Sequence, residues 1–183
     1  MEQLLFVLPL IAFLILLTLF ALVLRRAGRF IARTRDVERF RRQVGDLAGR
    51  IEHSLGEICA RVDELRRGQL GADALTDDLS ASLDAVGRYA DEARGLRPPA
   101  DARRIQDEIV GELERAARAL EMIEHGRSIQ ASARSGGREV EAQTSIKRGY
   151  LNVLHAREAI NHQAELARVV GVRDDAGLER PLP

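Results

Sequence analysis

The sequence begins with an apolar stretch that restricts the folds open to the chain. Residues 4–24 are 21 consecutive positions without a charged side chain, and only Pro9 and Thr18 among them are unfavourable in an apolar helix. Seventeen of them are Leu, Ile, Phe or Val. A helix needs about 20 apolar residues to cross a hydrocarbon core of about 30 Å, so the stretch predicts a transmembrane helix.

A cleavable signal peptide is the competing interpretation of this stretch. Such a peptide has basic residues before its apolar core and small residues at its cleavage site. Here Glu2 and Gln3 come before the core, and Arg25 and Arg26 follow it at once. Arginine near the end of a span stays on the cytoplasmic side. We therefore expect a single-pass protein of the cell membrane, with its N-terminus outside and the rest of the chain in the cytoplasm.

Positive charge is concentrated beside the predicted span. Residues 25–42 hold eight arginines and two acidic residues, a net charge of +6, whereas residues 43–183 hold 20 basic and 25 acidic residues, a net charge of −5. Arginines within about a Debye length of the span could bind anionic lipid headgroups. These candidates are Arg25, Arg26, Arg29 and Arg33. Nucleic acid is not an expected partner, because the remaining chain is acidic and lacks an aromatic platform.

Beyond the span, the sequence predicts an all-α fold. Aromatic residues make up only 4% of the chain, and apolar positions recur at spacings of three and four. Glycine and proline divide the pattern into four predicted helices, namely one from Gly28 to the region 68–71 and then 72–94, 100–134 and 138–170. Short connections favour an antiparallel four-helix bundle, with a pair of long helical hairpins as the variant.

The apolar stripes also predict the core and the domain limits. The expected core residues are Phe40, Val44, Leu47, Ile51, Leu55, Ile58, Val62 and Leu65, then Leu75, Leu79, Leu83 and Val86, then Ile105, Ile109, Leu113, Ala116, Leu120 and Ile123, and finally Ile146, Tyr150, Val153, Ile160, Ala164 and Ala167. We divide the chain into the N-terminal segment and span (1–24), an Arg-rich juxtamembrane helix (25–42), a bundle domain (43–170) and a disordered tail (171–183).

A weak metal-binding pattern occurs in the fourth predicted helix. His155, Glu158, His162 and Glu165 have helical spacing, and four-helix bundles do build metal sites from imidazoles and carboxylates. The di-iron motif has the reverse order, with Glu before His. The evident facing ligands are Glu121, Glu124 and His125. Because the four residues lie off the apolar stripe, we interpret them as surface pairs and predict no metal or other cofactor.

Three glycines of the first soluble helix form a candidate self-association face. Gly45, Gly49 and Gly56 share one side of the helix, nearly opposite its apolar stripe. Each costs about 1 kcal/mol relative to Ala in a helix, so their clustering suggests that another backbone approaches there. Cys59 is the single cysteine, which excludes an intrachain disulfide and favours a small structural residue over a reactive thiol.

No motif indicates catalysis. The chain has no Gly-rich phosphate loop, no CxxC pair and no zincin-like helix. A span followed by cytoplasmic helices resembles the plan of LemA-type proteins and of spectrin-like division regulators, although no residue is carried over from them. The expected function is that of a non-enzymatic, membrane-anchored interaction or scaffold protein with a protein partner or a second copy. A metal-binding or catalytic bundle and a regulatory subunit of a membrane complex are the alternatives.

Overall fold

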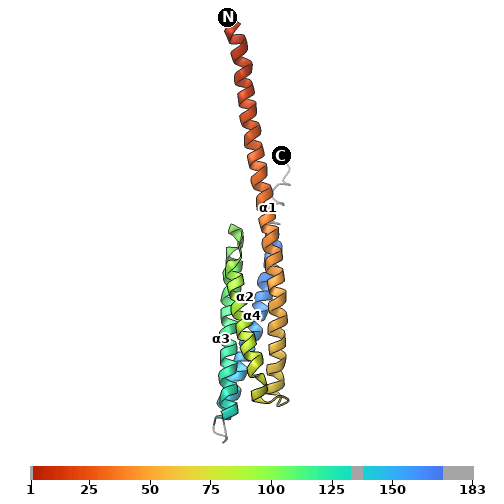
Figure 1. Cartoon of the computed structure of the whole chain (residues 1–183), viewed down its shortest axis with the longest axis vertical. Coiled ribbons are helices and arrows are strands. Elements are labelled where there is room, and N and C mark those ends of the chain that lie inside the picture. The colour runs from red at the N-terminus through yellow and green to blue at the C-terminus, as the bar shows by residue number, and fades with distance from the viewer. Residues whose placement is uncertain (1, 133–137, 171–183) are drawn as a thin grey trace, which may run out of the picture.

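The protein is all-helical, as the sequence predicts. The computed structural model describes residues 2–132 and 138–170, with the side chains of the first helix from residue 34 onward and some of those before it. Four long helices make up the chain (Figure 1): α1 (Glu2–Arg66), α2 (Thr76–Gly95), α3 (Arg103–Ser132) and α4 (Glu139–Val169). Short 3₁₀ helices, Ala72–Leu75 and Ala100–Ala102, precede α2 and α3. The predicted tail, 171–183, lies outside the described residues.

Helix α1 is a single helix of 65 residues, which at 1.5 Å per residue is about 98 Å long. It continues without interruption through Gly28, where the sequence analysis begins the first soluble helix. Figure 1 shows its N-terminal part projecting well beyond the bundle formed by the other helices. Val37 is the first of its described side chains to be buried, and the bundle therefore begins near that residue.

The expected transmembrane helix is not confirmed by the structure. Among the residues that the structure describes, no helix combines the length and the apolar character needed to cross a membrane. The span over residues 4–24 therefore stays a prediction from the sequence.

Helices α1 to α4 form an antiparallel bundle around one apolar core (Figure 1). Every predicted core position of α1 and α3 is buried, from Phe40 and Leu55 to Leu113 and Leu120, which are fully enclosed. The 3.6-residue period of the apolar stripes explains this agreement, because it places those side chains on one helix face. Among the predicted core positions of α2 and α4, Leu83 and Tyr150 are only partly buried, at the edge of the core.

The four seams of the bundle are packed unequally. Contact is most extensive between α3 and α4 and least extensive between the neighbours α1 and α2. Gly126 of α3 lies against Ala142 of α4, and Gly149 of α4 lies against Ala119 of α3. A Cβ atom at either glycine would come within 2.8 Å of a backbone oxygen of the opposite helix. Glycine therefore lets these two backbones approach closely.

The α2–α3 turn is held by one side chain. The Nε2 atom of Gln106 donates to the backbone oxygens of Ala93, Arg94 and Leu96 at 2.8, 3.1 and 3.1 Å. The last carbonyls of a helix have no partner within the helix, so these bonds satisfy groups that would otherwise need water. Leu96 is itself buried. The turn is thus fixed to α3 by both polar and apolar contacts.

Candidate functional site

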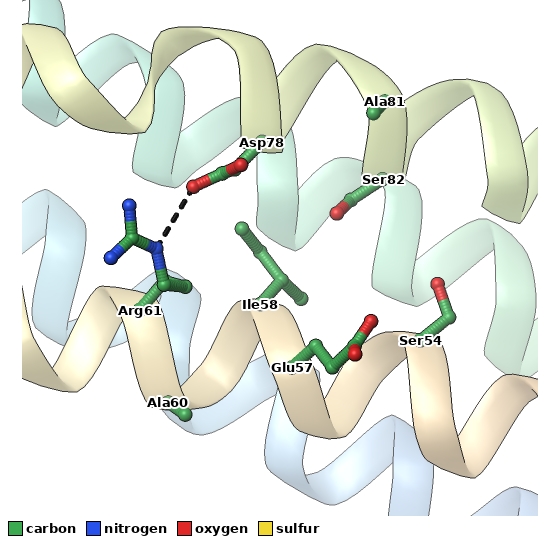
Figure 2. A pocket seen from close by; sticks show the side chains of 8 residues that line it. All are labelled: Ser54, Glu57, Ile58, Ala60, Arg61, Asp78, Ala81 and Ser82. Carbon is green, nitrogen blue, oxygen red and sulfur yellow. Dashed lines mark hydrogen bonds and ion pairs between the residues drawn. The ribbon is translucent and has the colours of Figure 1, made fainter.

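The weakly packed seam between α1 and α2 contains a groove of about 540 Å³. Its walls are Ser54, Glu57, Ile58 and Arg61 of α1 and Asp78 and Ser82 of α2, with two alanines (Figure 2). Serine and alanine side chains are too short to fill the space between two helices that lie apart. The small residues along the seam therefore leave a groove between the two helices.

Two ion pairs bridge α1 and α2 on either side of the groove. The Nε atom of Arg61 lies 3.0 Å from Oδ2 of Asp78, and a guanidinium nitrogen of Arg50 lies 2.5 Å from Oε1 of Glu92. The hydrogen bond to Asp78 raises the pKa of Arg61, and the bond to Glu92 raises the pKa of Arg50. All four side chains are 41–50% exposed, so these pairs stabilise the fold only weakly.

The groove offers polar groups over an apolar floor. Figure 2 shows Ile58 in the middle of the groove, with the Ser82 hydroxyl pointing in from α2 and Ser54 and Glu57 reaching in from α1. Among the described residues, neither hydroxyl has a hydrogen-bond partner. The Glu57 carboxylate lies 3.3 Å from His53, in an exposed pair that is ionic only when the histidine is protonated. Both hydroxyls and this carboxylate are therefore available to a bound partner.

Ser54 and Ser82 are the hydroxyl-bearing side chains of the groove. A nucleophilic serine needs a base within hydrogen-bond reach, and that base needs a residue to orient it. In the described part of the chain, no hydrogen bond links Ser54 or Ser82 to a histidine or a carboxylate. The groove offers a contact surface with hydroxyl and carboxylate groups.

The histidine and glutamate pattern of α4 faces outward. His155, Glu158, His162 and Glu165 are all exposed, and Glu165 is paired with Arg168 at 2.8 Å. In residues 2–132 and 138–170, no three His, Cys, Asp or Glu side chains are grouped as ligands for a metal ion. Glu124, one of the suggested facing ligands, binds Arg127 at 2.5 Å instead.

The lipid-binding candidates lie on the projecting part of α1. Arg25 is exposed, whereas the side chains of Arg26, Arg29 and Arg33 lie outside those that the structure describes. No bundle helix covers Arg25, so its side chain is available to a membrane surface or to solvent.

The glycine candidates divide into two groups. Gly45 and Gly49 are exposed, and a Cβ atom there would meet nothing within 4 Å. A Cβ atom at Gly56 would lie 3.7 Å from the guanidinium of Arg157 on α4. Gly56 therefore lies beside the seam with α4, and the open face consists of Gly45 and Gly49.

Cys59 is part of the core, as a structural residue would be. It is 6% exposed, and burial raises the pKa of its thiol to about 11. The thiolate is the reactive form of cysteine, and it is scarce near neutral pH when the pKa is this high.

The sequence pattern does not reveal the groove, because the groove depends on which helices pair and how far apart they lie. One signal was present, namely the small residue Ser82, which shares the buried face of the second helix with Leu79 and Val86. Small side chains on a core-facing side predict either a close approach or a gap. Here they leave a gap.

No protein-family model, curated protein or solved structure matches this chain.

Proposed function

We propose that this protein is a membrane-anchored helical scaffold whose bundle binds a protein partner in the cytoplasm. The observation that carries the proposal is the projection of α1 beyond the bundle. The described large apolar side chains of that projection are 54–65% exposed: Phe13, Leu16, Leu17, Leu19, Phe20, Leu22 and Val23. A contiguous exposed apolar surface of this kind is typical of segments that meet a membrane or another protein.

The sequence favours a membrane as the surface that covers these side chains. Residues 4–24 contain no charge, and the arginines begin directly after Leu24. That arrangement supports insertion with the bundle on the cytoplasmic side. The continuity of α1 supports a direct mechanical connection between the inserted segment and the bundle.

The α1–α2 groove is the partner-binding surface in this proposal. Its unpartnered hydroxyls and the Glu57 carboxylate can receive polar groups, while Ile58 supplies an apolar contact. The space between Ser54 and Ser82 suits a helix with small side chains at its contact positions. Self-association through Gly45 and Gly49 is the second mode of interaction, because none of the described residues covers that face.

Membrane extraction tests the anchor. Wild-type protein should stay with the membrane fraction after washing with alkaline carbonate, and Leu16→Arg/Phe20→Arg should move to the soluble fraction. Val140→Arg is the matched control, since Val140 is 77% exposed on α4 and its replacement should leave the protein in the membrane. Release of the wild-type protein by carbonate would overturn the anchor, and a reporter fused to Pro183 that is active only outside the cell would overturn the orientation.

Cysteine cross-linking tests self-association. Gly49→Cys should form a disulfide-linked dimer in membranes, whereas Gly111→Cys, at an equally open position on α3, should not. Both variants carry Cys59→Ala so that the introduced cysteine is the only one. A strictly monomeric Gly49→Cys variant would remove the dimer from the proposal.

Site-specific photo-cross-linking tests the groove. A photoreactive side chain at Ser82 should capture a partner that the same group at Thr144, exposed on α4, does not capture. Ser54→Arg, which fills the groove from the opposite wall, should abolish the capture. Capture that survives Ser54→Arg would place the partner elsewhere on the bundle.

A further inference from the structure

The α2–α3 turn carries unpaired positive charge at the end of the bundle from which α1 projects (Figure 1). Residues 97–104 contain Arg97, Arg103 and Arg104 with one acid, Asp101, and have a net charge of +2. In the described part of the chain, Arg97 and Arg103 have no carboxylate partner. Arg104 lies 3.8 Å from Glu108 with a side chain that is 90% exposed, so this pair neutralises it little.

The frame of this turn is rigid. Gln106 binds three carbonyls at the end of α2, Leu96 is buried, and the backbone nitrogen of Ala102 donates to the Pro99 oxygen at 2.9 Å. Pro98 and Pro99 fix two further φ angles. The arginines are therefore held at one end of the bundle by a preformed turn rather than by a loop that must first be ordered.

The same end of the bundle is fastened to α1 and α4. Arg41 of α1 donates a hydrogen bond to the backbone oxygen of Val170 at the end of α4. This bond joins the end of α4 to α1 near the residue where the bundle begins. Any tilt of α1 changes the distance between the turn and whatever surface surrounds the N-terminal part of α1.

We propose that the α2–α3 turn is a second membrane-contact site, which binds anionic lipid headgroups through Arg97, Arg103 and Arg104. This inference rests on the membrane anchor proposed above. The folded bundle would then contact the membrane itself, in addition to the contact made by the juxtamembrane arginines of α1. The partner is the lipid surface in which the same chain is anchored.

Simple geometry decides whether the turn can reach that surface. Val37 lies 13 helical steps after Leu24, so an upright α1 holds the bundle about 20 Å from the hydrocarbon. The headgroup layer fills roughly 5 to 7 Å of this distance, which leaves a gap longer than the Debye length of about 8 Å. An upright protein therefore gains little from these arginines.

A tilted α1 closes the gap. Transmembrane helices tilt by about 20° on average and by up to about 40°. The turn lies on the helix pair beside α1, roughly 10 Å from the α1 axis. A tilt of about 30° toward that side lowers the turn to about 12 Å from the hydrocarbon, or about 5 to 7 Å from the headgroups, which is within the Debye length. Anionic lipid should thus select this direction of tilt.

Fluorescence quenching in reconstituted membranes tests the contact. The full chain with Cys59→Ala and Ala100→Cys carries a fluorophore in the turn, and the membranes contain a headgroup-linked quencher. We expect strong quenching in phosphatidylcholine mixed with phosphatidylserine, weak quenching in phosphatidylcholine alone, and loss of the difference at high salt. The same fluorophore at Ala131→Cys, at the far end of α3, should not be quenched in either membrane.

Charge removal in the turn identifies the contacting residues. Arg97→Gln and Arg103→Gln should each lower the ratio of docked to undocked protein about fivefold, the effect of one arginine near an anionic surface. Lys147→Gln/Arg148→Gln is the matched control, because both residues are exposed and unpaired among the described residues but lie toward the other end of the bundle.

Failure of this inference is distinguishable from failure of the anchor. Equal quenching of the Ala100→Cys fluorophore in both membranes, by protein that resists carbonate extraction, would overturn the contact and leave the anchor intact. Protein that carbonate releases from both membranes would overturn the anchor, and with it the inference. Equal losses from the arginine variants and the Lys147→Gln/Arg148→Gln control would likewise overturn the contact.

Discussion

Gly149 of α4 lies so close to α3 that a Cβ atom at this position would meet Cγ1 of Ile123 at 2.6 Å. The reciprocal contact is made by Gly126, where a Cβ atom would meet Cγ1 of Ile146 at 2.8 Å. The two glycines are thus a matched pair, each facing an isoleucine of the other helix. At this pair the backbones of α3 and α4 approach closely. The seam between α1 and α2, in contrast, contains a groove and is bridged by ion pairs.

Gly149→Ala should destabilise the bundle by about 1 to 3 kcal/mol, because overpacking forces the backbones of α3 and α4 apart. Gly111→Ala is the matched control on α3, where a Cβ atom meets nothing within 4 Å. That control should stabilise the helix by about 0.5 to 1 kcal/mol. Urea unfolding of both variants measures the difference, and equal stabilities would show that the two helices can separate without cost.

Raising the pH above about 9 should weaken the fold through Cys59. Burial raises the pKa of this thiol from 9.0 to about 11, so the folded state holds its proton more tightly than the unfolded state does. The contribution is fully present below pH 9 and is lost as the pH rises toward 11. At about 1.4 kcal/mol per pKa unit, the loss amounts to roughly 2 to 3 kcal/mol.

The Cys59→Ala variant isolates this effect. The difference in unfolding free energy between wild type and Cys59→Ala should shrink between pH 9 and pH 11 and stay constant below pH 9. Thiol reagents should also react with folded wild type far more slowly than with unfolded protein. A difference that does not change with pH would mean that the Cys59 thiolate is accommodated in the folded state.

Gln106→Ala should destabilise the bundle by about 1 to 3 kcal/mol, because it removes the side-chain donor of the Arg94 and Leu96 carbonyls. Gln43→Ala is the control, since Gln43 is exposed on α1 and the structure gives its side chain no hydrogen bond. Amide hydrogen exchange should rise near Ala102 and Leu96 in the first variant only. If both variants unfold at the same urea concentration, the capping bonds contribute nothing measurable.

Arg61 and Asp78 should couple only weakly. Their side chains are 41% and 42% exposed, and exposed pairs contribute about 0.2 to 1 kcal/mol. A double-mutant cycle with Arg61→Ala and Asp78→Ala measures the coupling, which should fall further in high salt. A coupling of several kcal/mol would mean that this pair stabilises the α1–α2 seam far more than its exposure allows.

The sequence pattern predicts the helices well, because their limits depend on local signals. Pro98, Pro99 and the glycines of the connections interrupt the apolar period, and the observed ends fall within a few residues of them. The stripe of α1 is fully confirmed from Phe40 to Leu65. The second and third predicted helices are the local exceptions, since they begin with the 3₁₀ helices Ala72–Leu75 and Ala100–Ala102.

Contacts between helices were predicted less well, because they depend on partners far away in the sequence. The glycines singled out from the sequence were those of α1, yet the close approach occurs at Gly126 and Gly149. A usable signal was present, since Gly149 lies within the apolar stripe of α4, three residues after Ile146 and four before Val153. A glycine inside a core stripe predicts a close approach more directly than glycines opposite the stripe.

Buried charge was the other feature that the pattern did not reveal. Arg127 is only 8% exposed and binds Glu124 within α3 while reaching toward Asp73 at 3.8 Å. Its place on the helix follows the core period, which would normally exclude an arginine. Its charge is satisfied mainly by Glu124 of the same helix, and the α1–α2 connection adds the more distant Asp73 and the backbone oxygen of Ala72 at 3.5 Å.

Because α1 is one continuous helix, the orientation of the bundle about the α1 axis is coupled to that of the N-terminal segment. Each residue of a helix turns the chain by about 100°, so one alanine inserted between Leu24 and Val37 would swing the α2–α3 turn by that angle and raise it by about 1.5 Å. Seven inserted alanines would bring the turn back to within about 20° of its original direction. The number of residues between Leu24 and Val37 therefore determines which side of the bundle faces a neighbour or a tilted membrane.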